Sequence, residues 1–128
     1  MSAWKFAFAL IAAAPATVFA PSALAQDAAA GERQFKARCG SCHSVEAGQN
    51  RIGPELSRVV GREAGSVDGA RYSAALKRSG IVWDAGTLDA YLANPRQAVP
   101  GTSMPVGLTN AGQRAQVIEY LRSLSSGG

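Results

Sequence analysis

Apolar residues recur at helical spacing in separate parts of the chain. Near the C-terminus, Val117, Leu121 and Leu124 occupy positions i, i+4 and i+7 of one helix face. This spacing predicts a final helix over about residues 110–124. Residues 28–40 also place small and apolar side chains four positions apart, which predicts a first helix there.

Two shorter helices are predicted between these segments. Residues 71–80 read as a short helix with Gly80 as its stop signal. The next helix has Thr87 as its predicted N-cap and ends at Pro95. Residues 44–70 are rich in glycine and charge, and no stretch alternates strictly enough to predict a strand. We therefore expect a small all-α domain of about four helices with long loops.

The first 25 residues have the three-part pattern of an export signal. "MSAWK" carries one positive charge at Lys5, the apolar run "FAFALIAAA" follows, and residues 23–25 give a small–x–small cleavage pattern. A membrane anchor is the alternative, but the run is short for a span of about 20 residues and two prolines interrupt the segment. We expect cleavage after Ala25, one domain over residues 26–128, and a periplasmic location.

The charge of the chain is mildly basic and evenly spread. It has 13 Lys and Arg against 9 Asp and Glu, a formal net charge of +4. Because these charges are scattered rather than clustered, nucleic-acid binding is not expected. A basic balance suits an acidic partner surface.

The segment "RCGSCHSV" carries the most specific chemistry of the chain. Cys39 and Cys42 have two residues between them, and His43 follows directly. A structural zinc site needs four ligands, and the chain has no further Cys or His to complete one. A redox-active dithiol is the other alternative, but such a motif usually accompanies a βαβ pattern, which is not predicted here.

The spacing C-x-x-C-H is also the motif of covalent c-type haem attachment. Cys39 and Cys42 can both reach the vinyl groups on one porphyrin edge, and His43 can then ligate the iron. Because a five-residue motif can occur by chance, support from a second iron ligand is needed. Methionine sulfur is a known second ligand beside histidine. Apart from the initiator residue the chain has one methionine, Met104, in the stiff segment "PGTSMPVG".

With these residues in place, the chain resembles the class I c-type cytochromes, in the branch that mitochondrial cytochrome c shares with bacterial periplasmic relatives. The motifs that carry the resemblance are, in order, "GERQFKARCGSCH", "GPEL", "GR", "GIVW", "TLDAYLANP", "PGTSM" and "VIEYL". The resemblance implies a cytochrome c-like fold wrapped around one haem c, bonded to Cys39 and Cys42 and ligated by His43 and Met104. It also implies that the first helix crosses the last, with Gly31 and Phe35 at the contact.

The resemblance assigns roles to further residues. The Pro54 carbonyl is similar to the group that accepts a hydrogen bond from His43, an interaction that fixes the tautomer of a ligand. The residues that the resemblance places around the haem propionates are Arg62, Tyr72 and Trp83. The hydroxyl residues that it places on the Met104 side are Tyr91 and Thr102. Two loop positions that often hold lysine in the family are Gln97 and Ser103 here.

The function implied is that of a monomeric one-electron carrier between membrane redox complexes in a respiratory or photosynthetic chain, and not of an enzyme. The residues expected to form a basic docking face are Arg33, Arg38, Arg51 and Arg96. A peroxidase-like or gas-sensing haem protein is the alternative, but the single histidine leaves no distal histidine for peroxide cleavage. A dedicated electron-transfer subunit docked to a dehydrogenase is a third possibility.

Overall fold

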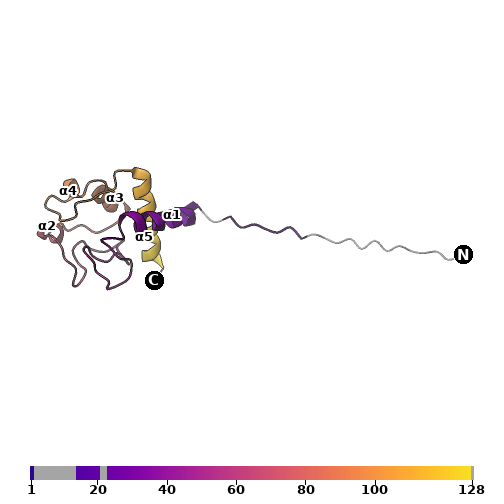
Figure 1. The fold of residues 1–128 in the computed structure, drawn as a ribbon, viewed down its shortest axis with the longest axis horizontal. Helices are drawn as coiled ribbons and strands as arrows, with labels where there is room; N and C mark the ends of the chain where they lie inside the picture. The colour runs from indigo at the N-terminus through magenta and orange to yellow at the C-terminus, as the bar shows by residue number, and fades with distance from the viewer. Residues whose placement is uncertain (2–13, 21–22, 128) are drawn as a thin grey trace.

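The computed structural model describes Met1, residues 14–20 and residues 23–127, and its regular secondary structure in these residues is helical (Figure 1). The helices are α1 (Ala23–Arg38), α2 (Ala74–Lys77), α3 (Ala85–Ala93), α4 (Pro95–Ala98) and α5 (Ala111–Ser126). Glu63 and Val82 form an isolated antiparallel bridge. The predicted all-α class is confirmed, with one short helix, α4, more than the sequence indicated.

Helices α1 and α5 cross each other, and the other helices and loops lie on one side of this pair (Figure 1). Gly31 lies at the crossing, where an added Cβ would fall 1.9 Å from the carbonyl oxygen of Gln116. One turn later the Phe35 and Tyr120 rings pack at a centroid distance of 5.8 Å. The absence of a side chain at Gly31 therefore lets the two backbones touch, as the resemblance implied.

The N-cap of helix α3 (Ala85–Ala93) lies three residues before the predicted one. Asp84 is the N-cap, and its carboxylate accepts a hydrogen bond from the Thr87 N–H at 2.8 Å. The Thr87 hydroxyl accepts in return from the Asp84 N–H at 2.9 Å. The prediction of Thr87 as N-cap is wrong because this residue is the reciprocal partner in a capping box. Asn94 then ends α3 and caps α4 through Gln97.

Helix α2 is shorter than residues 71–80, the range predicted for it. The Ser73 hydroxyl caps its start by accepting from the Leu76 N–H at 3.1 Å. At the other end the Ser79 hydroxyl donates to the Leu76 carbonyl at 2.8 Å, which satisfies that carbonyl without another helical turn. Gly80 follows with a φ of 66°, and the chain turns away.

The core lies between the crossed helices, α3 and the long loops. The buried apolar residues are Phe35, Val59, Ala64, Leu76, Trp83, Leu88, Tyr91, Leu92, Val99, Leu108, Val117, Ile118 and Leu121. Several of these come from residues 56–64 and 99–108, which are loops rather than helices. The irregular segments therefore contribute directly to the interior.

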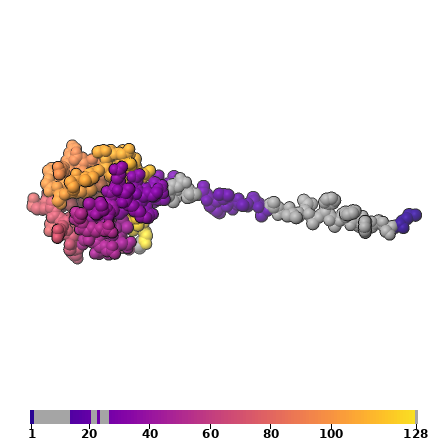
Figure 2. All heavy atoms as spheres, in the orientation of Figure 1, coloured from indigo at the N-terminus to yellow at the C-terminus, as the bar shows by residue number. Residues whose placement is uncertain are grey.

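Most of the expected export signal, residues 2–13 and 21–22, lies outside the described residues. Residues 14–20 are exposed and have no regular structure, and Figure 2 shows them outside the compact body. The expected cleavage point after Ala25 falls in the first turn of α1. Within the part of the chain that the structure describes, no helix is long and apolar enough to cross a membrane.

Candidate cofactor site

One large cavity of about 640 Å³ lies between the end of α1, the long loops, α3 and the segment around Met104. Its size falls within the range of about 300–1,000 Å³ that is typical of cofactor sites. The predicted site residues that line it are Cys39, Cys42, His43, Pro54, Arg62, Tyr72, Trp83, Tyr91, Thr102 and Met104. All ten predicted positions therefore share one cavity, although they are spread over more than 60 residues of sequence.

The two cysteines and His43 are held by a tight turn at the end of α1. The N–H groups of Cys42 and His43 both donate to the Cys39 carbonyl, at 3.0 and 2.9 Å. This turn brings all three side chains to the same wall of the cavity. Cys39 and Cys42 are not joined by a disulfide.

The environment of Cys39 bears on the alternatives of zinc and a redox dithiol. Burial raises the pKa of its thiol to about 11, and the neighbouring Cys42 raises it further in the same direction. Burial therefore disfavours the thiolate, the form that exchanges disulfides. In the described residues no three His, Cys, Asp or Glu side chains gather as a metal site.

His43 is oriented for ligation by its contact with the loop. Its Nδ1 lies 2.7 Å from the Pro54 carbonyl oxygen. Since a carbonyl can only accept, Nδ1 carries the proton and Nε2 keeps its lone pair. Burial lowers the pKa of the imidazole, although the Pro54 contact opposes this change. The ring is therefore neutral near pH 7, the form in which histidine binds a metal.

Gly53 is a site residue that the sequence did not single out. An added Cβ there would lie 2.3 Å from Cε1 and 2.7 Å from Nδ1 of His43. Its N–H also donates to the Cys42 carbonyl at 2.8 Å. The bare backbone of Gly53 thus forms a flat support for the imidazole. The signal that could have revealed it is its place beside Pro54 in "GPEL".

Met104, which also lines the cavity, lies in a short hydrogen-bonded network. The Tyr91 hydroxyl is 2.6 Å from the Thr102 hydroxyl oxygen, which also accepts from the Met104 N–H at 3.4 Å. Burial raises the pKa of Tyr91, with the Thr102 contact opposing it, so this hydroxyl remains neutral. The network connects Tyr91, on the buried face of helix α3, to the loop that holds Met104. It therefore limits the positions open to the Met104 side chain.

A third group of residues lies around the remaining wall. Arg62 donates to the backbone carbonyl of Glu55 at 2.7 Å, and its guanidinium also contacts the Glu55 carboxylate. The Tyr72 hydroxyl accepts from the Val67 N–H at 3.2 Å, which leaves its own proton free to donate. The Trp83 ring packs against Tyr91 at a centroid distance of 5.1 Å. The sequence did not reveal the Glu55 contact, because nothing in an irregular loop indicates which charges meet.

The four arginines of the expected docking face are all exposed: Arg33, Arg38, Arg51 and Arg96. Arg38 lies directly at the cavity wall. Arg51 donates to the Gly40 carbonyl at 2.7 Å, beside the cysteine turn. Arg114 differs from these four, because it is largely buried, pairs with Asp89 at 2.8 Å and binds the backbone at the end of the Met104 loop.

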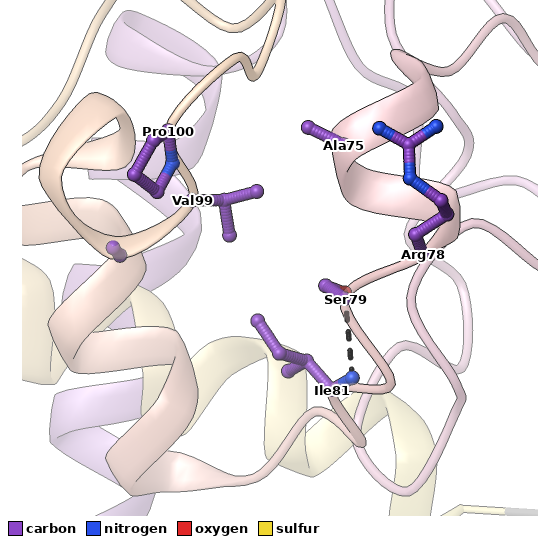
Figure 3. A pocket seen from close by; sticks show the side chains of 7 residues that line it. Ala75, Arg78, Ser79, Ile81, Val99 and Pro100 are labelled. Carbon is purple, nitrogen blue, oxygen red and sulfur yellow. Dashed lines mark hydrogen bonds between the residues drawn. The ribbon is translucent and has the colours of Figure 1, made fainter.

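A second hollow of about 440 Å³ lies between α2 and the segment after α4 (Figure 3). Ala75 and Arg78 face Val99 and Pro100 across it, with Ile81 at its base. The Ser79 hydroxyl beside it accepts from the Ile81 N–H at 3.3 Å and is therefore occupied within the chain. None of the predicted site residues lines this hollow.

Comparison with known proteins agrees with this geometry. The family model "Cytochrome c" matches residues 28–125. Cytochrome c2 of Rhodomicrobium vannielii is 48% identical over 109 residues, covering 83% of this chain and 86% of that protein. The cytochrome c-type protein cyt cy of Rhodobacter capsulatus is 44% identical over 105 residues, covering 81% of this chain. The match spans only 52% of the length of that longer relative.

A solved structure is also similar. Cytochrome cH from Methylobacterium extorquens superposes with a TM-score of 0.71 at 44% identity, covering 76% of this chain and 98% of that one. The chain therefore belongs to the cytochrome c family. Its members are electron-transfer proteins, and membership implies one covalent haem c.

Proposed function

We propose that this chain is a one-electron carrier of the periplasm whose haem occupies the 640 Å³ cavity, with His43 and Met104 as the iron ligands. The observation that carries this proposal is the shared cavity, in which the C-x-x-C-H turn and Met104 line the wall together. The apolar lining suits a porphyrin face. When bound, a haem supplies one-electron chemistry between ferric and ferrous iron.

The residues of the chain would hold and tune that group. The S–H groups of Cys39 and Cys42 would each add across a vinyl double bond, which gives two thioethers with no loss of atoms. His43 would bind through Nε2, because Nδ1–H is engaged by Pro54. The soft sulfur of Met104 would favour the reduced ion and raise the reduction potential. With His43 and Met104 as its ligands, the iron would have no open site for a substrate.

The location and partners form a finer part of the proposal. We propose that residues 1–25 direct export and are removed, because their charge and apolar pattern is that of a secretory signal. The partners would be membrane redox complexes or other electron-transfer proteins that meet the exposed arginines. The chain would act as a monomer.

A redox-titrated visible spectrum of the purified holoprotein tests the core of this proposal. We expect a c-type spectrum, a reversible one-electron transition, and the weak sulfur-to-iron charge-transfer band in the ferric state. Acid-acetone extraction of the denatured protein should leave the colour with the polypeptide. Extraction of the haem into the organic phase would contradict attachment through Cys39 and Cys42.

A docking prediction follows from the place of Arg38 at the cavity wall. Arg38→Glu should slow association with an acidic redox partner by about tenfold or more at low salt, because complementary charges accelerate encounter. The difference should shrink as ionic strength rises and screens the charges. Stopped-flow electron transfer over a salt series measures both effects.

The matched control is Arg58→Glu, since Arg58 is also exposed but does not line the cavity. Arg114 is unsuitable for this purpose because its charge is part of the internal contact with Asp89. Equal slowing by the Arg38 and Arg58 substitutions would argue against a docking face around the cavity.

The ligand set should also persist to high pH. A lysine can replace Met104 on iron only as the neutral amine, and residues 94–108 contain no lysine. Lys36 lies on α1, where its hydrogen bond and charge interaction with Glu32 raise the pKa of the amine, so its neutral form appears only at higher pH. A ferric pH titration followed by the sulfur–iron band should show Met104 bound well above neutral pH.

Installing lysine by Gln97→Lys or Ser103→Lys should lower the pH at which the band disappears. The product should have the electron paramagnetic resonance signal of a nitrogen-ligated low-spin iron. A lysine-ligated form in the unaltered chain at moderately alkaline pH would contradict the argument from the missing loop lysines.

A further inference from the structure

Among the described residues, Glu55 is a charged residue that lies buried in the interior. It is 8% exposed, and among the described residues the other buried polar residue is the uncharged Ser44. A carboxylate removed from water is costly unless it is paired and hydrogen-bonded. Neither the sequence motifs nor the proposed ligation gives Glu55 a role, so its partners are the place to look for one.

The carboxylate, the backbone carbonyl and the backbone N–H of Glu55 each have a hydrogen-bond partner. One carboxylate oxygen accepts from the Ser57 N–H at 2.7 Å, and the other lies 3.4 Å from Nη1 of Arg62. The backbone carbonyl of Glu55 accepts from Nη2 of Arg62 at 2.7 Å, and its own N–H donates to Asn50 at 3.0 Å. Burial alone would raise the pKa of Glu55, but the contacts with Ser57 and Arg62 outweigh it and lower the pKa. The side chain is therefore an anion.

Arg62 connects this anion to the cavity. Arg62 lines the cavity and its side chain is 17% exposed. A guanidinium has five N–H donors in a fixed plane. Glu55 takes one from each terminal nitrogen. This leaves three N–H donors for other acceptors.

We propose that Glu55 is a positioning residue that fixes the Arg62 guanidinium at the cavity wall and neutralises its charge there. The pair would offer hydrogen-bond donors to the carboxylates of a bound haem, while its own net charge is zero. This inference rests on the proposed function, since the pair matters for the potential only if the cavity holds the redox group.

If the two residues act as a pair, removing either charge should shift the reduction potential, in opposite directions for the two residues. A nearby negative charge stabilises the oxidised form, which carries one more positive charge than the reduced form. Removing the charge of Glu55 should therefore raise the midpoint potential, and removing the charge of Arg62 should lower it. Removing both charges together should bring the potential back close to that of the unaltered protein.

The first experiment is Glu55→Gln in the holoprotein, which keeps the size and an acceptor oxygen but removes the charge. We expect the reduction equilibrium with a fixed mediator to shift toward the reduced form by roughly threefold to tenfold. A tenfold shift corresponds to about 59 mV for one electron. The matched control is Glu63→Gln, because Glu63 is exposed and no ion pair joins it to Arg62 among the described residues. A Glu55→Gln shift no larger than that of the control would overturn the inference.

The second experiment tests the pair itself through stability. Arg62→Gln should lower both the potential and the unfolding midpoint, since it leaves a buried carboxylate without its partner. Adding Glu55→Gln to Arg62→Gln should recover part of the lost unfolding midpoint and reverse the shift in potential. A double variant no more stable than Arg62→Gln would show that the two residues do not act as a pair.

Should Arg62→Gln fail to fold, Arg62→Lys takes its place. Lysine keeps the charge but has no planar fork to bridge the carboxylate and the carbonyl. We expect a nearly unchanged potential with a lower unfolding midpoint, and an unfolding midpoint equal to that of the unaltered protein would overturn the positioning role. Failure of the proposed function would be distinct, because the unaltered holoprotein would then show no reversible one-electron titration.

Discussion

Replacing Met104 with alanine is expected to lower the midpoint potential by a large part of the roughly 0.8 V range over which axial ligands set haem potentials. The reason is that thioether sulfur stabilises the reduced ion, and alanine offers no donor in its place. The ferric charge-transfer band of sulfur-ligated iron should disappear as well. Redox titration and ferric absorption spectra measure the two effects.

The control for this substitution is Val106→Ala, which shortens another side chain that lines the cavity, two residues away. Val106 is 63% exposed, so its loss should leave the fold, the band and the potential nearly unchanged. Persistence of the band in the Met104→Ala protein would mean that another group ligates the iron. The Tyr91–Thr102 contact would then serve only the fold.

Replacing Gly31 with alanine is expected to destabilise the fold by about 3 kcal/mol or more, at the upper end of the usual overpacking cost. The added methyl would lie 1.9 Å from the Gln116 carbonyl oxygen and 2.8 Å from the Tyr120 Cβ. Since the nearest of these atoms is backbone, helices α1 and α5 must move apart. The unfolding midpoint of the holoprotein should fall by roughly 10 °C or more.

The matched control is Gly86→Ala, the same substitution within helix α3. There the nearest atom to an added Cβ is a carboxylate oxygen of Asp84 at 3.4 Å, an ordinary contact. Because alanine is the better helix former, this variant should be unchanged or slightly more stable, by up to about 1 kcal/mol. A Gly31→Ala protein as stable as the Gly86→Ala control would show that the crossing tolerates a methyl group.

The elements that the sequence predicted well are those with a strong local pattern. Helix α5 repeats its apolar residues over several turns. Its observed range, Ala111–Ser126, differs from the predicted range of about 110–124 by only one or two residues at each end. The ends of the short helices were less predictable, because Asp84 and Thr87 are both good capping residues and only the three-dimensional contact decides between them. Helix α4 has four residues, too few to show a period.

The candidate site divides in the same way. The positions of Cys39, Cys42, His43 and Met104 were predictable because these residue types are rare in the chain and their chemistry is specific. Their roles as haem attachment points and iron ligands remain predictions. Gly53 was not predictable because its effect is the space that it leaves beside the His43 ring. Glu55 was missed because its partner is set by the path of an irregular loop.

The contacts of Arg114 have a consequence for how sequences of this fold can change in length. Arg114 holds the carbonyls of Leu108 and Thr109 to helix α5, so the loop after Met104 is anchored to that helix. Helix α5 is in turn locked against α1, which leads directly into the cysteine turn. The spacing between the two sides of the cavity is therefore set by one helix pair rather than by the chain between them. Insertions and deletions in residues 66–70, which contribute no buried side chain and do not line the cavity, can accumulate while that spacing stays fixed, whereas a single residue gained between Met104 and Arg114 must be absorbed beside Met104.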